Sequence, residues 1–555
     1  MEGIGIGVSD FKILRKKELY YIDKTLFIRH IIDNPSGVTL ITRPRRFGKT
    51  LNMSMLRHYF DCTEKDSKEL FEGLKIMEQG ENYTSKLGKY PVIYITLKDV
   101  QGRNFENAML MFQMQIAELF IDHSYLLKSE KITDAEKELI NTFMSYKANK
   151  IQLQNAIKIL SRILNKEFDM PVYIIIDEYD VPLQHAYVHG FYNEAVEFLK
   201  TFFGVSFKDN PYMEKTVLTG VSRVAKESIF SGANNFKVFT VLDNEFAEDF
   251  GITKEEMKKV IQDFNIQEDE EDIKKWYDGY TIGNTSGIYN PWSILNYLTD
   301  KKLMPYWVNT SSNDLIKLIL KKSSTVKLQI EKLLKDEPIE VPIDLETVIT
   351  GIENNENNIW GLLLGTGYLK VVETVDVSEG IYKVMIPNNE IKELFRSIVR
   401  DWFRDKVIGN DLRSIMKDLI TLNLEEFEDK FKILTMQMFS FMDVGENTAE
   451  NFYHAFVLGM LVALKDSYVV NSNRESGLGR YDIMLEPKDK DANSFIMEFK
   501  VFREDREKNI EETIANAQKQ IEEKQYETSL RERGFKNITK MVFAFNGKEV
   551  KIKTY

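Results

Sequence analysis

The chain has 555 residues, of which 43% are hydrophobic and 12% aromatic, a composition typical of folded globular domains. This length predicts about three domains, and the net charge of -12 argues against tight non-specific nucleic-acid binding by the whole molecule, though not against a local basic groove. The single cysteine, Cys62, excludes an intramolecular disulfide, and no Cys/His spacing is typical of a zinc site. Because neither a leader-like N-terminus nor an apolar stretch of about 18 residues is present, we expect a cytoplasmic protein without a membrane segment.

An apolar, β-branched run that starts at Val38 predicts a buried strand. The chain then passes through residues 43–47, closes on Gly48-Lys49-Thr50, and continues into a helix-compatible stretch at 51–60. This order of strand, loop and helix is the layout of a phosphate-binding loop.

The chemistry of such a loop requires these residue types in this order. Backbone N–H groups of the loop and of the helix N-terminus converge on phosphate oxygens, where the helix dipole also favours negative charge. Lys49 would reach the outer phosphates, and the hydroxyl of Thr50 could ligate Mg²⁺. The residues predicted to bind nucleotide are Arg45, Arg46, Phe47, Gly48, Lys49 and Thr50.

The loop departs from the standard pattern at its first position. That pattern, G-x-x-x-x-G-K-[ST], has glycine where this chain has Arg43. Taken alone, Gly48-Lys49-Thr50 would also fit a strand-to-helix turn with a surface lysine, so the second half of the site has to decide between the two.

Further strands are predicted at 90–97 and 172–176, with two long helical stretches between them, around 105–127 and 134–164. Strands that alternate with helices favour a parallel sheet covered by helices on both faces. We therefore expect an α/β domain with the fold of a P-loop NTPase.

Asp177 and Glu178 follow directly after the strand at 172–176. In an open α/β sheet, ligands bind beyond the carboxyl ends of the strands, where the Lys49 loop is also expected. Asp177 is predicted to hold Mg²⁺ through water, and Glu178 to orient or deprotonate the attacking water. A buried strand that ends in a polar turn would explain the pair alone, but it does not explain the pair together with the loop.

A fourth strand is predicted at 215–221 and ends at Ser222 and Arg223. An arginine at this place could stabilise the negative charge that develops on the terminal phosphate during catalysis. It could equally be a surface salt-bridge partner, and the sequence leaves both interpretations open.

Six motifs resemble the bacterial AAA-ATPase-like family, a branch of P-loop ATPases that carries Arg-Arg-Phe-Gly-Lys-Thr in the loop. They are Y-I-D-K-T (21–25), R-P-R-R-F-G-K-T (43–50), I-I-I-D-E-Y-D (174–180), T-G-V-S-R-V-A-K-E-S-I-F-S-G-A-N-N-F (219–236), W-Y-D-G-Y (276–280) and Y-N-P-W-S (289–293). The resemblance covers about residues 5–300. It implies ATP as the ligand and a sensor-like role for Arg223.

Residues 301–425 predict helices near 313–321 and 326–334, followed by a hairpin of 371–374 and 381–386. Helices followed by a β-hairpin suggest a winged-helix arrangement. Such a module can bind DNA, or it can serve as a lid or packing element in an ATPase. The acidic composition favours the second role.

Past residue 426, strands at 481–485 and 494–501 predict another hairpin. Side chains alternate between the two faces of a strand, so Glu498 and Lys500 share one face. If Asp482 faces the same way, two carboxylates can hold Mg²⁺ with Lys500 beside the attacking water, an arrangement that suits phosphodiester cleavage. Charges that alternate with apolar residues also describe the solvated face of many strands.

The surrounding sequence is similar to PD-(D/E)xK nuclease-like domains of the type often fused behind AAA-ATPase-like modules. The similarity is carried by N-R-E-S-G-L-G-R-Y-D (473–482) and A-Q-K-Q-I (517–521). By this resemblance Asp482, Glu498 and Lys500 match the catalytic motif, and Gln520 matches the glutamine of the family's helix.

Glu450 is the match, by the same resemblance, for an accessory acidic residue that would add a metal ligand. The usual proline before the first aspartate is replaced by Tyr481. This substitution puts the activity in doubt rather than the fold.

We therefore predict a P-loop ATPase domain at 1–300, a helical or winged-helix-like connector at 301–425, and an α/β, restriction-endonuclease-like nuclease domain at 426–555. The expected cofactors are ATP and Mg²⁺, and the expected substrate is nucleic acid, DNA in preference to RNA. Nucleotide state would gate the nuclease, and a homo-oligomer is left open because neighbouring copies often supply arginines in such ATPases.

Two alternatives remain open. In the first, the protein is a nucleotide-switched binding or signalling module whose nuclease fold no longer cuts. In the second, the nuclease is active and the P-loop is a sensor that binds nucleotide but barely hydrolyses it.

Overall fold

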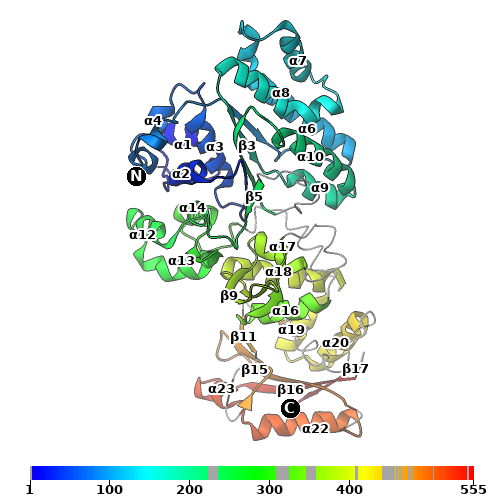
Figure 1. The fold of residues 1–555 in the computed structure, drawn as a ribbon. Coiled ribbons are helices and arrows are strands. Elements are labelled where there is room, and N and C mark those ends of the chain that lie inside the picture. Colours follow the sequence, from blue (N-terminus) through cyan, green and yellow to red (C-terminus); the bar gives the residue numbers. More distant parts are fainter. Residues whose placement is uncertain are drawn as a thin grey trace. The chain divides into compact units, whose positions relative to one another are not determined.

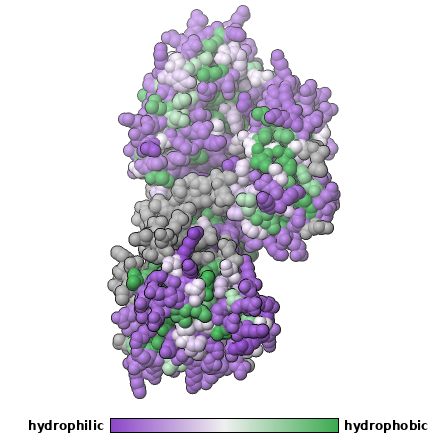
Figure 2. Space-filling view, turned by 180° about the vertical axis from the view of Figure 1, so that it is seen from behind, coloured by the Kyte–Doolittle hydropathy of each residue, from purple (hydrophilic) through white to green (hydrophobic). Residues whose placement is uncertain are grey.

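The computed structural model describes residues 3–222, 236–307, 324–345, 358–406, 411–439, 467–472, 475–476, 479–503, 506–546 and 549–555, together with 457, 460, 461 and 464. The chain divides into two compact units. The first comprises residues 1–323 and 336–392, and the second comprises residues 324–335 and 393–555. Hydrophilic side chains cover most of the face drawn in Figure 2, in keeping with a charged fraction of 29%.

The first unit contains a five-stranded parallel sheet (Figure 1) with the strand order β2-β3-β4-β1-β5. Its strands are β1 (Val38–Thr42), β2 (Val92–Thr96), β3 (Val172–Asp177), β4 (Met213–Gly220) and β5 (Phe236–Phe239). The first four were predicted from their apolar runs. The short edge strand β5 was not predicted, because it offers only four residues and one of them, Lys237, is exposed.

Helices cover both faces of this sheet. They are α1 (Phe11–Lys16), α2 (Leu26–Asp33), α3 (Lys49–Phe60), α4 (Ser67–Phe71), α5 (Glu81–Thr84), α6 (Phe105–Asp122), α7 (Asp134–Met144), α8 (Lys150–Phe168), α9 (Val181–His189) and α10 (Tyr192–Phe207), with 3₁₀ turns η1 (Lys75–Glu78) and η2 (Ser124–Lys128). Leu40 and Ile174 pack into a core with α6, α8 and α10, whereas Ile41 and Ile175 pack into a core with α1, α2 and α3. The predicted parallel sheet with helices on both faces is confirmed.

The helical stretch expected at 134–164 is two helices, α7 and α8. The helical conformation is interrupted at Tyr146, which has a left-handed φ of 59°. Helix α8 restarts with a capping box, in which the side chains of Asn149 and Gln152 each accept a hydrogen bond from the other residue's backbone N–H.

The remainder of the first unit follows β5. It contains α12 (Lys254–Asp263), η3 (Gln267–Asp269), α13 (Glu270–Tyr277), the hairpin β6 (Tyr280–Ile282) and β7 (Thr285–Ile288), α14 (Pro291–Asp300) and α17 (Asn358–Gly365), and an antiparallel sheet of β8 (Ile339–Pro342), β10 (Ile381–Met385) and β9 (Lys370–Asp376). Strands β9 and β10 form the hairpin predicted for the connector. The predicted helix at 313–321 lies outside the described residues, and the winged-helix interpretation stays a prediction.

Residues 336–392 pack against the part of the first unit that carries the Lys49 loop. A Cβ built on Gly367 would lie 2.7 Å from a side-chain carbon of Pro44, and one built on Gly279 would lie 2.2 Å from the carbonyl oxygen of Pro387. The side-chain amide of Asn388 donates to the carbonyl of Asp278 at 2.9 Å. The backbone therefore approaches the Pro44 ring at Gly367 and another backbone segment at Gly279 so closely that neither position has room for a side chain.

Glu390 is a buried carboxyl in the same region and provides a pH prediction. It accepts hydrogen bonds from Ser293 Oγ at 2.8 Å and from the backbone N–H of Trp307 at 2.6 Å, and burial raises its pKa from 4.5 to about 7. The folded state holds this proton more tightly than the unfolded state. The contribution of Glu390 to stability is therefore fully present below about pH 4.5 and is lost as the pH rises to about 7. Between pH 5 and pH 8, the free energy of unfolding should fall by up to about 3 kcal/mol.

Chemical denaturation at several pH values measures this effect. Glu390→Gln should flatten the decline, whereas Glu373→Gln, which changes an exposed glutamate of β9, should leave it in place. An unchanged decline in Glu390→Gln would assign the pH dependence to another group.

The second unit has a mixed five-stranded sheet with the order β11-β14-β15-β16-β17, in which β15 and β16 are parallel and the other neighbours antiparallel. Its strands are β11 (Tyr468–Ser472), β14 (Ile483–Pro487), β15 (Ser494–Val501), β16 (Ile538–Asn546) and β17 (Glu549–Thr554), with a small pair β12 (Glu475–Ser476) and β13 (Gly479–Arg480). The predicted hairpin is β14–β15.

The helices of this unit are α16 (Ser324–Leu334), α18 (Asn389–Lys406), which starts in the first unit, α19 (Asp411–Ile420), α20 (Leu424–Phe439), α22 (Ile510–Glu523) and α23 (Thr528–Glu532). Phe495 and Met497 pack into the core with α19 and α20, whereas Ile496 packs into the core with α22 and α23. No helix in the described part of the chain is both long and apolar enough to cross a membrane.

Candidate active sites

The predicted phosphate-binding loop lies between the end of β1 and the start of α3. Gly48 has a φ of 84°, which glycine adopts without strain, and α3 begins at the next residue. Lys49 is only 3% exposed, and its Nζ donates to the carbonyl oxygens of Arg43 and Pro44 at 3.3 and 3.2 Å. Thr50 follows in the first turn of α3. The ammonium therefore lies inside the loop, where phosphate oxygens could replace the two carbonyls.

Arg46 and Phe47 join the loop to the two aromatic motifs of the sequence. The guanidinium of Arg46 stacks over the indole of Trp292, 4.2 Å from the ring centroid. Phe47 is buried and packs edge-on against Tyr280, with ring centroids 4.9 Å apart. Arg46 also has a φ of 66°, which is costly for a residue with a side chain. These contacts give W-Y-D-G-Y and Y-N-P-W-S a structural role beside the loop.

Arg43, at the position where the standard pattern has glycine, is fully buried. Burial lowers its pKa to about 10, so it stays charged at neutral pH. Its guanidinium donates to five backbone carbonyls, those of Thr42, Phe239, Thr240, Glu245 and Phe246. Arg43 therefore ties the start of the loop to β5 and to the turn that follows it.

Asp177 is the last residue of β3 and is 1% exposed. Its Oδ1 accepts a hydrogen bond from Thr219 Oγ1 at 2.7 Å, while its Oδ2 has no hydrogen-bond partner among the described residues. Burial and then the charge of Glu178 raise the pKa of Asp177, and the Thr219 and Thr50 hydroxyls and Lys49 offset part of this rise. A cation beside Oδ2 would favour the ionised form.

Glu178 follows with a left-handed φ of 54°. Its Oε1 lies 3.6 Å from Lys49 Nζ, so the strand end and the loop lie together at one edge of the sheet. Positive φ at a residue other than glycine costs about 1–3 kcal/mol and tends to occur at functional sites. Arg223, the predicted sensor, lies outside the described residues.

A second group of candidate residues gathers on the face of β15 that α22 covers. Glu498 is buried, and its Oε1 accepts hydrogen bonds from Lys500 Nζ at 2.8 Å and from Gln520 Nε2 at 2.6 Å. Asp482 directly precedes β14, and its Oδ2 accepts the backbone N–H of Phe499 at 2.8 Å. The two strands and the helix thus bring Asp482, Glu498, Lys500 and Gln520 to one place.

Sequence reasoning missed Tyr526 at this place. Gln520 Nε2 also donates to the hydroxyl of Tyr526 at 3.0 Å, and Tyr526 is buried. Its ring meets that of Tyr481, which stands where the nuclease motif usually has proline, at a centroid distance of 6.3 Å. Tyr526 follows α22 without any motif around it, so only the structure reveals it. Glu450 lies outside the described residues.

Comparisons with known proteins match the two parts of the chain in which these residues lie. Residues 5–230 match the profile of a family described as a predicted AAA-ATPase, and residues 448–555 match the PD-(D/E)XK nuclease superfamily. The chain joins an AAA-ATPase-like domain to a PD-(D/E)XK nuclease-superfamily domain. Both resemblances inferred from the sequence are confirmed.

A curated relative carries the description "Uncharacterized protein in vnfD 5'region" and comes from Azotobacter chroococcum mcd 1. It is 24% identical over 390 residues, which is 70% of this chain and 68% of the relative. The AAA-ATPase match ends at residue 230, before the two aromatic motifs that support the loop.

Both domains offer residues that fit Mg²⁺. In the AAA-ATPase-like domain, the buried Asp177 Oδ2 has no hydrogen-bond partner among the described residues, and the Thr50 hydroxyl is close enough to affect its pKa. In the nuclease-superfamily domain, Asp482 and Glu498 supply two carboxylates. No group of three or more His, Cys, Asp or Glu forms a ready-made metal cage in the described part of the chain. Magnesium fits such open sites, because it commonly takes one or two carboxylates and completes its shell with water and phosphate.

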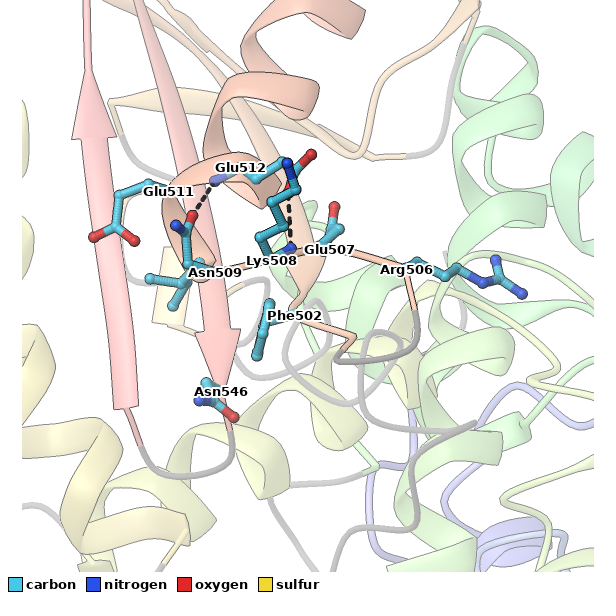
Figure 3. Close-up of a pocket in the computed structure, with 9 residues that line it drawn as sticks. Phe502, Arg506, Glu507, Lys508, Asn509, Glu511, Glu512 and Asn546 are labelled. Carbon is cyan, nitrogen blue, oxygen red and sulfur yellow. Dashed lines mark hydrogen bonds between the residues drawn. The ribbon is translucent and has the colours of Figure 1, made fainter.

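A cleft of about 780 Å³ lies at the N-terminus of α22 in the nuclease-superfamily domain (Figure 3). Glu512 N–H donates to the side chain of Asn509, and the Glu512 carboxylate accepts the backbone N–H of Lys508 at 2.7 Å. The helix end is therefore already capped by protein groups. Three glutamates but only two cationic side chains, Arg506 and Lys508, line the cleft. Because negative charge prevails there, the cleft does not suit a phosphate.

Proposed function

We propose that this protein binds and hydrolyses ATP at the Lys49 loop and cleaves nucleic-acid phosphodiesters at Asp482, Glu498 and Lys500. The observation that carries the ATP site is the buried Asp177 carboxylate, whose Oδ2 has no hydrogen-bond partner among the described residues. The Asp177 carboxylate lies at the same edge of the sheet as Lys49 and Glu178. Lys49 Nζ and Glu178 Oε1 are 3.6 Å apart. The family matches support both chemistries.

In the proposed ATP site each residue has a distinct task. Lys49 exchanges its carbonyl partners for oxygens of the outer phosphates, and Glu178 orients or deprotonates the attacking water. Thr50 and Asp177 hold Mg²⁺. When bound, Mg²⁺ neutralises negative charge on the phosphates. Gly48 lets the backbone N–H groups at the start of α3 approach the phosphate.

In the proposed nuclease site, Asp482 and Glu498 hold Mg²⁺. When bound, the metal lowers the pKa of its water and polarises the scissile phosphate. Lys500 offsets the negative charge that develops there. Gln520, which donates to Glu498 Oε1, keeps that carboxylate in one orientation. The proposed substrate is nucleic acid, DNA ahead of RNA.

Nucleotide state is proposed to gate the nuclease. The support for this coupling is that both domains belong to one chain. If it holds, ATP changes the rate of cleavage in the full-length protein. The alternative of an inactive nuclease fold, suggested by Tyr481 in place of proline, requires that no divalent metal ion support cleavage.

The ATP site is tested by Lys49→Ala and Glu178→Gln. Lys49→Ala removes charge-assisted bonds to phosphate and should weaken ATP binding by about 10- to 100-fold. Glu178→Gln keeps the shape of the side chain but removes the base, so it should retain binding and lower kcat by about 100-fold or more. Calorimetry and phosphate release measure the two effects, with Lys258→Ala on the exposed face of α12 as the control.

Cleavage assays on plasmid DNA and on RNA, with and without ATP and Mg²⁺, test the remaining parts. A cleavage rate that ignores ATP in wild type would contradict the gating. Full function in Glu178→Gln beside a complete loss in Lys49→Ala would favour the nucleotide sensor that barely hydrolyses. A wild-type protein that binds neither ATP nor ADP would contradict the proposed ATP site itself.

A further inference from the structure

The two residues after Glu178, Tyr179 and Asp180, hold the end of β4. Asp180 is fully buried, and its Oδ2 accepts hydrogen bonds from the backbone N–H of Ser222 at 2.8 Å and from its Oγ at 2.7 Å. The backbone N–H of Val221 donates to the same oxygen at 3.2 Å, and the Tyr179 hydroxyl donates to the carbonyl of Ser222 at 2.8 Å. The strand end is thus bound on both its N–H and its carbonyl side.

Gly220 makes this close approach feasible. A Cβ at Gly220 would lie 2.6 Å from Asp180 Oδ1 and 2.6 Å from the ring of Tyr179. Its carbonyl oxygen accepts the backbone N–H of Arg43, the first residue of the loop, at 3.1 Å. The strand end that Asp180 holds therefore also fixes where the loop begins.

A second connection runs from Asp180 to the loop through a side chain of α9. Gln184 Nε2 donates to Asp180 Oδ2 at 2.7 Å, and Gln184 Oε1 accepts from Arg45 Nη2 at 3.0 Å. The amide can have only one orientation here, because turning it over would place its NH₂ group against the guanidinium and its carbonyl against the carboxylate. The four hydrogen bonds that Asp180 Oδ2 accepts favour a negatively charged carboxylate, which would polarise the amide and strengthen the acceptor that Arg45 meets.

We propose that Asp180 and Gln184 are positioning residues that hold the Arg45 guanidinium for the terminal phosphate of the bound nucleotide. The planar guanidinium carries its donors in a fixed fork that matches phosphate oxygens. Anchoring Nη2 to Gln184 fixes the plane of that fork relative to the loop. This inference rests on the proposed ATP site and adds to it the residues that distinguish ATP from ADP.

The decisive variant is Gln184→Met, which keeps a helix-forming side chain of similar volume and removes both hydrogen bonds. Its affinity for a non-hydrolysable ATP analogue should fall about tenfold, the effect of losing one charge-assisted bond. Its affinity for ADP should stay within about twofold, because ADP lacks the terminal phosphate. Gln262→Met, on the exposed face of α12, serves as the matched control and should bind both nucleotides like wild type.

A double-mutant cycle separates positioning from general stability. If Arg45 acts through Gln184, the Arg45→Ala/Gln184→Met protein should bind the analogue no more weakly than Arg45→Ala alone. Asp180→Asn should also reduce the preference for the analogue over ADP. If Asp180→Asn does not fold, the double-mutant cycle of Arg45→Ala and Gln184→Met alone tests the positioning role.

The outcomes separate the two proposals. If wild type binds both nucleotides and Gln184→Met loses the analogue and ADP equally, or loses neither, the positioning role is overturned while the ATP site stands. Additive losses in the cycle overturn it as well. If wild type binds neither nucleotide, the proposed ATP site fails and the positioning role fails with it.

Discussion

Arg43→Gly, which restores the standard loop pattern, is expected to destabilise the protein rather than to improve the loop. The buried guanidinium donates to five backbone carbonyls, and its loss would leave them without these donors in the interior. Because an unsatisfied buried polar group costs about 1–3 kcal/mol, the free energy of unfolding should fall by at least about 3 kcal/mol. Urea denaturation of the full-length protein measures the change.

Two further variants sharpen this test. Arg162→Ala removes an exposed arginine of α8 and should change the free energy of unfolding by no more than about 0.5 kcal/mol. Arg43→Lys keeps the positive charge but lacks the planar fork, so it should recover only part of the loss. A wild-type unfolding curve for Arg43→Gly would show that these carbonyls find other partners.

Glu498→Ala is expected to abolish metal-dependent cleavage at the nuclease site. The side chain is buried between β15 and α22 and interacts with both Lys500 and Gln520, so its removal takes away a proposed metal ligand and the partner of two donors. Loss of supporting contacts alone typically lowers metal affinity or activity by about 10- to 100-fold, and loss of the ligand itself should exceed that. Degradation of plasmid DNA over a range of Mg²⁺ concentrations measures the effect.

Glu549→Ala is the matched control, because this glutamate is exposed at the start of β17 in the same sheet. It should cleave like wild type. Calorimetric titration with Mn²⁺ gives a readout that does not depend on cleavage, and Glu498→Ala should bind the metal more weakly than the control. Equal binding and equal cleavage in the two variants would support the signalling alternative, in which the nuclease fold no longer cuts.

The sequence predicts those parts of the fold that follow from local periodicity. The apolar runs at β1 and β3 are buried on both faces, and helices cover both sides of their sheet as expected. Alternation along β15 places Glu498 and Lys500 on one face, where their side chains meet at 2.8 Å. Such predictions succeed because side chains alternate along a strand, so a residue's position in the strand determines which face its side chain occupies.

The contacts that the sequence does not predict join residues far apart in the chain. Arg43 and its carbonyl partners at the end of β5 and in the turn after it are separated by 196 to 203 positions. Gln184 lies on α9 outside every motif, and only the packing of α9 beside the loop shows that it connects Arg45 with Asp180. Hydrogen bonds from side chains to distant groups leave no periodic signal in the sequence. The sequence therefore shows that Arg43 replaces the glycine of the loop pattern, but it does not predict which groups Arg43 binds.

The close approach of Gly367 to Pro44 affects how the protein can be dissected. A recombinant fragment that stops at residue 300 would lack the backbone that covers Pro44 and the Asn388 amide that binds the carbonyl of Asp278. Apolar surface beside the loop would then meet solvent, and such a fragment would tend to aggregate. A fragment that carries the AAA-ATPase-like domain therefore has to include residues 336–392, which belong to the same compact unit.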